Sequence, residues 1–144
     1  MNLGRRSSFC ASSSGTNVQG TLTYDKLFLD QNNIEGASLD TGSGKFTAGL
    51  SGSYQVMISA EVVSSPGQYH SIWVAVNDVK KEESLIQTMA DKNMYGAGFD
   101  NASRDIVLNL TAGQTVSISH ETDGIEKLVN VIFCVSSMKV KENN

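Results

Sequence analysis

The sequence of 144 residues has little of the inventory on which enzymes depend. It contains only two histidines, His70 and His120, and only two cysteines, Cys10 and Cys134. A nucleophilic cysteine needs histidine and asparagine partners, and neither thiol has obvious ones in the sequence. The Gly-x-Ser-x-Gly, phosphate-loop and His-Glu-x-x-His motifs are also missing. We therefore expect a protein that is not an enzyme, and the sequence indicates no cofactor.

Basic charge and long apolar runs are equally scarce. The chain has 11 Lys and Arg against 15 Asp and Glu, a formal net charge of −4, and its basic residues are scattered. Nucleic-acid binding needs a clustered basic surface, so we expect no nucleic-acid partner. No apolar run approaches the roughly 18–20 residues of a membrane-spanning helix, so we expect no membrane insertion.

The first eight residues lack the apolar core of a secretory signal. Taken literally, this indicates a cytosolic protein. The alternative is that an upstream signal, with or without a stalk, was removed or never cloned. Two cysteines do not decide between these compartments, because buried free thiols are ordinary in cytosolic proteins.

What the sequence does contain is a series of short β signals separated by turns. Thirteen glycines and one proline divide the chain. Residues 54–62 and 115–119 alternate apolar and polar side chains, as half-buried strands do. Eight or more such segments at even spacing predict an all-β sandwich or jelly roll. Residues 128–135 differ, because nearly every one is apolar, and such a strand needs cover on both faces. A neighbouring subunit or a loop of the same chain could supply that cover.

Five blocks in a fixed order carry a family resemblance. They are Phe9-Cys-Ala11, the turn Gly20–Lys26, the set Gly44, Phe46, Thr47, Ala48, Gly52 and Tyr54, the set Leu108, Leu110, Gly113 and Val116, and Phe133 near the end. In this order and spacing they resemble the globular-head domain of the complement C1q family. The resemblance covers essentially residues 7–140. Residues 1–6 are then a disordered or vector-derived leader, and residues 141–144 a tail.

The resemblance implies a jelly-roll β-sandwich of two antiparallel sheets that assembles into a homotrimer. It also implies secretion, with the signal peptide removed or not cloned. The apolar stretch 128–135, with Trp73 and Ala75 on a second strand, favours a trimer as well, because a stable monomer rarely exposes so much apolar surface. We take Trp73, Val131 and Phe133 as the candidate trimer-interface residues.

The sequence also departs from the family pattern. Gly49 replaces a proline, Gln114 replaces an acidic residue, and the end of the last strand differs. These changes put in doubt a calcium site of the kind that some members carry near the trimer apex. Residues 80–89 have the spacing and composition of a short helix. The family pattern places a strand there, and we follow the family.

The densest polar cluster is His120, Glu121 and Asp123. We expect both histidines in loops or at strand ends, and this cluster in a solvated turn. It lacks the alternating carboxylates of a calcium loop, so we predict no metal site. Loops at the end of a sandwich often carry recognition residues, which makes the three residues ligand-loop candidates.

Two Asn-x-Ser/Thr tripeptides are candidate glycosylation sites if the chain is exported. They begin at Asn101 and Asn109. We expect Asn101 in a glycine-rich loop, where it is the better acceptor. Asn109 is expected on the outward face of a strand, where pairing or a trimer contact could cover it.

The two cysteines are predicted to form a disulfide because of the resemblance. In this family the first and last strands are antiparallel neighbours, and opposed residues in such a pair lie within the reach of a disulfide. Phe9 would then face Val135, and Phe133 would face Ala11. The alternative is a pair of buried free thiols in a reducing compartment.

For function, the first hypothesis is a secreted trimeric head that binds glycans, proteins or other patterned extracellular ligands. The second is a structural, trimerising head of a matrix or collagen-like assembly. The third is a signalling ligand related to tumour necrosis factor, since that superfamily shares the fold. Fold analogy alone does not rank them.

Overall fold

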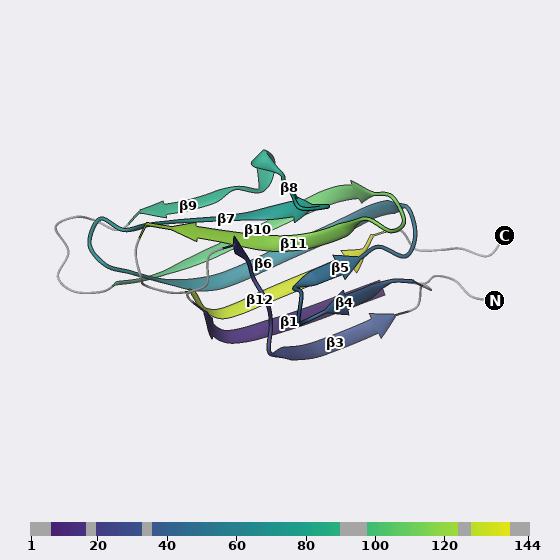
Figure 1. Cartoon of the computed structure of the whole chain (residues 1–144), viewed down its shortest axis with the longest axis horizontal. Coiled ribbons are helices and arrows are strands. Elements are labelled where there is room, and N and C mark those ends of the chain that lie inside the picture. The colour runs from purple at the N-terminus through teal and green to yellow at the C-terminus, as the bar shows by residue number, and fades with distance from the viewer. Residues whose placement is uncertain (1–6, 17–19, 33–35, 90–97, 124–127, 139–144) are drawn as a thin grey trace.

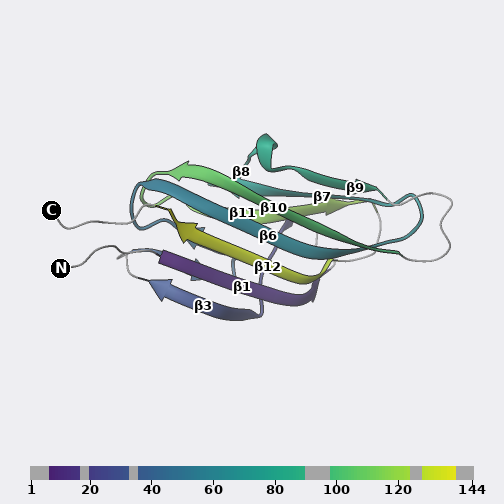
Figure 2. The same cartoon turned by 180° about the vertical axis from the view of Figure 1, so that it is seen from behind.

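The chain forms two antiparallel β-sheets around one shared hydrophobic core, seen in a computed structural model. The structure describes residues 7–16, 20–32, 36–89, 98–123 and 128–138. Figures 1 and 2 show the strands running in two layers along the long axis of the molecule. The predicted leader and tail lie outside the described residues. The all-β jelly-roll sandwich predicted from the sequence is confirmed.

The first layer is a five-stranded sheet. In spatial order it contains β10 (Gly98–Leu110), β6 (Gly52–Ser64), β12 (Leu128–Ser137), β1 (Ser7–Thr16) and β3 (Lys26–Asn32). All neighbours are antiparallel. The first strand and the last described strand, β1 and β12, are therefore side by side, as the family resemblance implied.

The second layer is a seven-stranded sheet built around β7 and β11. It contains β4 (Ser38–Asp40), β5 (Lys45–Thr47), β11 (Thr115–Thr122), β7 (Tyr69–Val76) and β8 (Val79–Lys80), with β2 (Gly20–Thr21) beside β11 and β9 (Ile86–Met89) beside β7. Strands β8 and β9 both pair with β7, at opposite ends of it. The sheet is therefore widest where β7 and β11 run together.

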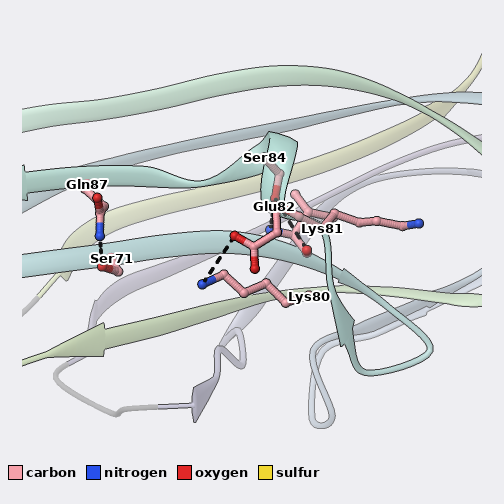
Figure 3. A network of polar contacts seen from close by, with 7 residues as sticks. Ser71, Lys80, Lys81, Glu82, Ser84 and Gln87 are labelled. Carbon is pink, nitrogen blue, oxygen red and sulfur yellow. Dashed lines mark hydrogen bonds and ion pairs between the residues drawn. The ribbon is translucent and has the colours of Figure 1, made fainter.

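Residues 79–89 form neither a helix nor one continuous strand. Strands β8 and β9 are separated by a single 3₁₀ turn, η1 (Glu82–Ser84). The Ser84 hydroxyl accepts a hydrogen bond from the Val74 N–H at 2.8 Å and donates one to the Lys81 carbonyl at 2.6 Å. Figure 3 shows this turn standing above β7. The buried Ser84 thus holds this turn against β7. Because this contact is tertiary, the helical spacing of residues 80–89 does not predict it.

The alternating strands deliver their apolar face to the space between the sheets. Tyr54, Val56 and Ile58 on β6 are at most 2% exposed, and Val116 and Ile118 on β11 are fully buried. Burying a side chain of this size contributes about 1.5–3 kcal/mol. Aromatic rings fill the centre, with Phe46 between Phe9 and Tyr54 and with Tyr24 against Phe133.

One glycine is required by a close approach of two backbones. Gly44 ends the turn between β4 and β5 with φ +74°. A Cβ atom at this position would overlap the Leu22 carbonyl oxygen. Only glycine satisfies both the positive φ and the contact, and this allows the turn to pack against the segment that follows β2.

Candidate functional site

The two cysteines form a disulfide on the outer face of the five-stranded sheet. Cys10 on β1 lies directly opposite Cys134 on β12, with a Cα–Cα distance of 4.1 Å. The neighbouring pairs are Phe9 with Val135 and Ala11 with Phe133, in the register expected from the sequence. Since side chains alternate along a strand, both phenylalanines point inward while both sulfurs lie outside the core.

The central part of this outer face, which we call the flat face, is poor in charge. A pocket of about 320 Å³ opens at its Ser12 and Ile132 end, beside Asp25 and Lys26. Three rows of side chains cross β10, β6, β12 and β1 in turn: Ser103, Ser59, Ile132 and Ser12; Asp105, Met57, Cys134 and Cys10; Val107, Gln55, Ser136 and Ser8. The one charged member of these rows, Asp105, lies on the edge strand. Small uncharged side chains of this kind allow another surface to approach closely, and depletion of charge is typical of interface cores.

Two of the three predicted interface residues occupy a different place. Val131 and Phe133 are fully buried in the core of their own chain, so the prediction that they face a neighbouring subunit is wrong. The apolar run of β12 is explained by its two faces. Val131, Phe133 and Val135 enter the core, and Ile132 lies half-buried on the outer face. A bulge near Asn130, where φ is +51°, shifts the register between Val129 and Ile132.

The third, Trp73, lies on the outer face of the seven-stranded sheet. It is half-buried on β7, and the Lys80 ammonium lies 4.6 Å from the centre of its ring. A cation over an aromatic face is attracted by the ring quadrupole. Trp73 is therefore a surface aromatic covered partly by its own chain.

The predicted ligand-loop residues do not converge at a loop. His120 and Glu121 both lie within β11, and Asp123 follows the strand. His120 is 1% exposed and faces the core, whereas the Glu121 side chain is exposed. The expectation of a solvated turn was wrong for His120 because the inward alternation of Val116 and Ile118 continues to it. That alternation was visible in the sequence.

His120 pairs with His70, which lies in β7 and is likewise buried. Nδ1 of His70 lies 2.8 Å from Nε2 of His120, and the rings stack with centres 5.1 Å apart. Nε2 of His70 lies 3.1 Å from the Val63 carbonyl oxygen, which can only accept a hydrogen bond. His70 therefore carries a proton on Nε2. The contact between the two rings needs one donor and one acceptor, so the pair cannot hold a proton on both facing nitrogens.

A pocket of about 470 Å³ opens on the outer face of the seven-stranded sheet, near the start of β7. Its walls come from four strands, and the residues that line it are Tyr69, Ser71, Lys80, Gln87, Thr88, Met89 and Glu121. Strand pairing aligns these side chains, because Ser71 is opposite Gln87 on one side and opposite Glu121 on the other. Of the residues proposed from the sequence, only Glu121 lines this pocket. The other lining residues come from three further strands, and no local motif could have grouped them with Glu121.

Two pairs of polar side chains in the pocket contact each other. The Tyr69 hydroxyl donates to the Glu121 carboxylate at 3.4 Å, and the Gln87 amide donates to the Ser71 hydroxyl at 3.4 Å. Figure 3 shows the Gln87–Ser71 contact, with the Lys80 side chain extending toward it. Desolvation, followed by the charges of Glu121 and Asp123, raises the pKa of Tyr69. The phenol therefore stays protonated, and a hydrogen-bond donor, at neutral pH.

Among the described residues, no three His, Cys, Asp or Glu side chains are grouped as a metal ion would require.

The two candidate glycosylation residues, Asn101 and Asn109, are both exposed, and both lie within β10. The expectation that Asn101 lies in a loop is therefore wrong. The Asn109 amide oxygen accepts a hydrogen bond from the Ser53 hydroxyl at 2.8 Å.

This jelly-roll sandwich, with a flat face on one sheet and a polar pocket on the other, has the build of an all-β recognition or trimerising module. A family model for the C1q domain matches residues 8–133. The chain belongs to the C1q domain family, whose domains serve recognition and structure rather than catalysis.

A solved structure agrees with this assignment. The globular domain of zebrafish complement 1qA protein matches with a TM-score of 0.67 and 16% identity, over 95% of this chain and 100% of that chain. At this identity the likeness establishes the fold alone. No curated protein matches the sequence. No helix among the described residues is long and apolar enough to cross a membrane.

Proposed function

We propose that the chain is a secreted, homotrimeric recognition head that binds glycans or other patterned extracellular ligands. C1q domains typically form trimers, bind ligands and act outside the cell, which supports the proposal at the level of the family. The observation that carries it for this chain is the contrast between the two outer faces. One carries a single charge in the three rows that cross β10, β6, β12 and β1, and the other holds the larger pocket, which is lined by Lys80 and Glu121.

The flat face suits contact with other copies of the chain. Across the three central rows of the five-stranded sheet, serine, methionine, isoleucine and glutamine surround the disulfide. Burying such a face costs little desolvation, because it removes few charges from water. Ser59 lies within this surface, on β6 between Ser103 and Ile132, and is half-buried.

The pocketed face remains free for ligand when the flat face is covered. Three copies would present three pockets, so a weak single-site affinity becomes strong binding to a surface that displays many ligands. A structural trimerising head would need only the flat face. The Tyr69, Gln87 and Glu121 side chains, which line a pocket of ordinary ligand-site volume, favour recognition.

The experiment compares the wild-type chain with Ser59→Arg on an immobilised panel of glycans and microbial surface polymers. A charge within the flat face should separate the subunits and reduce binding to dense surfaces, by about 100-fold through lost avidity. Ser43→Arg, in the exposed turn between β4 and β5, is the matched control. A trimer that binds nothing on the panel would favour the structural alternative. Equal binding by a monomeric Ser59→Arg variant would contradict the role of avidity.

A further inference from the structure

The pocket between β7, β8, β9 and β11 has a rigid frame. The Tyr69 N–H donates to the Asp123 carboxylate at 2.9 Å, and the Thr122 hydroxyl donates to the Tyr69 carbonyl at 2.7 Å. At the other end, the Lys81 N–H donates to the Val74 carbonyl at 2.9 Å. These short contacts fix the backbone from which the lining side chains project.

The groups that face the pocket are paired only loosely. The Tyr69–Glu121 and Gln87–Ser71 contacts are both 3.4 Å, and Lys80 lies 4.0 Å from the Glu82 carboxylate. Good hydrogen bonds of these types measure about 2.7–3.0 Å. The phenol, amide and carboxylate therefore retain much of their hydrogen-bonding capacity for a ligand, while the frame around them is already satisfied.

Charge narrows the class of ligand. The pocket has one ammonium, from Lys80, and one carboxylate, from Glu121. A cationic ligand would meet the lysine, and an anionic ligand would meet Glu121 with Asp123 close behind it. A neutral ligand with many hydroxyl groups is repelled neither by the lysine nor by the carboxylates. It can donate to the carboxylate and to the Gln87 carbonyl, and it can accept from the ammonium and the phenol.

The volume of the pocket and its aromatic wall also favour a neutral ligand with many hydroxyl groups. The volume of about 470 Å³ has room for one or two sugar rings. Tyr69 contributes an aromatic ring beside the polar groups, and half-buried Trp73 lies next along the same face of β7. An aromatic wall with a few placed polar groups binds the apolar face and the hydroxyl edge of a ring together.

We propose that this pocket binds a neutral sugar unit of a glycan, with Tyr69, Gln87 and Glu121 as the specificity-determining residues. This inference rests on the proposed function and names the ligand class and its site. Glu121 accepts from sugar hydroxyls, Gln87 both donates and accepts, and the Tyr69 ring packs against the sugar.

The test uses the full chain and a panel of oligosaccharides that end in neutral hexose or N-acetylhexosamine. The same cores carrying terminal sialic acid or sulfate form the second arm. Glu121→Gln, Gln87→Ala and Tyr69→Ala should each weaken binding of the neutral glycans by about 10-fold or more, the equivalent of one lost hydrogen bond to a charged group or one lost ring contact. Glu83→Gln, a change of the same chemistry at an exposed position in η1 outside the pocket lining, should bind like wild type. Circular dichroism of each variant checks that it is folded.

The outcomes separate the inference from the function on which it rests. Binding of neutral glycans by wild type, lost in the three variants and kept in Glu83→Gln, supports both. Binding that survives all three substitutions overturns the pocket and leaves the recognition function standing. Binding confined to the sialylated or sulfated arm overturns the ligand class. A wild-type chain that binds no glycan overturns the proposed ligand together with its site.

Discussion

Cys10 and Cys134 lie opposite each other in β1 and β12 and join residues that are 124 positions apart in the chain. The bond closes a loop that contains all the strands from β2 to β11. It therefore restricts the unfolded chain far more than a bond within a single hairpin would.

Removing this bond should lower the stability of the domain substantially. In the chain-entropy model a loop of this length contributes about 4–5 kcal/mol to the free energy of unfolding. We expect the double variant Cys10→Ser, Cys134→Ser to lose about that amount in urea titrations under oxidising conditions. Peptide mapping of the unreduced wild-type protein should find the cross-linked pair. Two freely alkylatable thiols in natively exported protein would contradict the bond.

Two tyrosine hydroxyls that are both removed from bulk water should respond oppositely to deletion. The Tyr54 hydroxyl donates to the Leu50 carbonyl at 2.6 Å, so Tyr54→Phe should cost about 1 kcal/mol of unfolding free energy. The Tyr24 hydroxyl is buried without a hydrogen-bond partner in the described part of the chain, and burial raises its pKa. Tyr24→Phe should be neutral or stabilising by up to about 1 kcal/mol. Thermal and urea unfolding of the two variants side by side provides the comparison, and a loss in Tyr24→Phe as large as in Tyr54→Phe would show that the Tyr24 hydroxyl has a partner.

The pairing of His70 with His120 predicts a stability that falls in acid. In the folded pair only one of the two facing nitrogens can carry a hydrogen. In the unfolded chain this restriction is absent, and both imidazole rings can be fully protonated. Below the ordinary histidine pKa of about 6.5 the unfolded state therefore binds more protons, so stability falls as pH decreases, by about 1.4 kcal/mol per pH unit for each proton.

Urea titrations between pH 7.5 and 5 measure this dependence. The double variant His70→Gln, His120→Gln should have a flatter profile than wild type. Identical slopes in the two proteins would mean that the pair does not control the acid response.

A substitution at Gly44 tests the close approach between the β4–β5 turn and the backbone near β2. Gly44→Ala combines a positive φ with an overlap onto the Leu22 carbonyl, and we expect a loss of more than about 2 kcal/mol. Gly113→Ala is the matched control, because its φ is +92° and no atom lies within 4 Å of the added Cβ. It should lose only about 1 kcal/mol, the strain of the backbone conformation alone. Equal losses in the two variants would remove the steric contribution of Leu22.

The sequence predicted the sandwich and the pairing of its ends because period-two alternation and the order of the family blocks are directly visible in it. The sequence of β12 does not show which of its residues face the core. The strand has a bulge, one face in the core and a half-buried Ile132 on the other face, so nearly every residue is apolar. Residues 80–89 have the spacing and composition of a helix, and the family pattern was needed to predict a strand there. The contact that holds the turn between β8 and β9 against β7, from Ser84 to Val74, is tertiary and leaves no local pattern.

The candidate pocket could not be predicted from the sequence. Tyr69, Gln87 and Glu121 belong to three different strands and meet only through the pairing of β7 with β9 and β11. The sequence identifies Glu121 as part of a polar cluster, but in β11 it alternates with His120, so the two side chains lie on opposite faces of the sheet. Polar residues in a sheet are grouped by register, which single-sequence patterns do not reveal.

Sedimentation equilibrium of the folded chain at micromolar concentration tests the central claim, a trimer that packs through the flat face of the five-stranded sheet, most directly. We predict a mass three times that of the chain for wild type and for Ser43→Arg, and the mass of a single chain for Ser59→Arg. A wild-type protein that sediments as a monomer at this concentration, or a Ser59→Arg variant that remains trimeric, would contradict it.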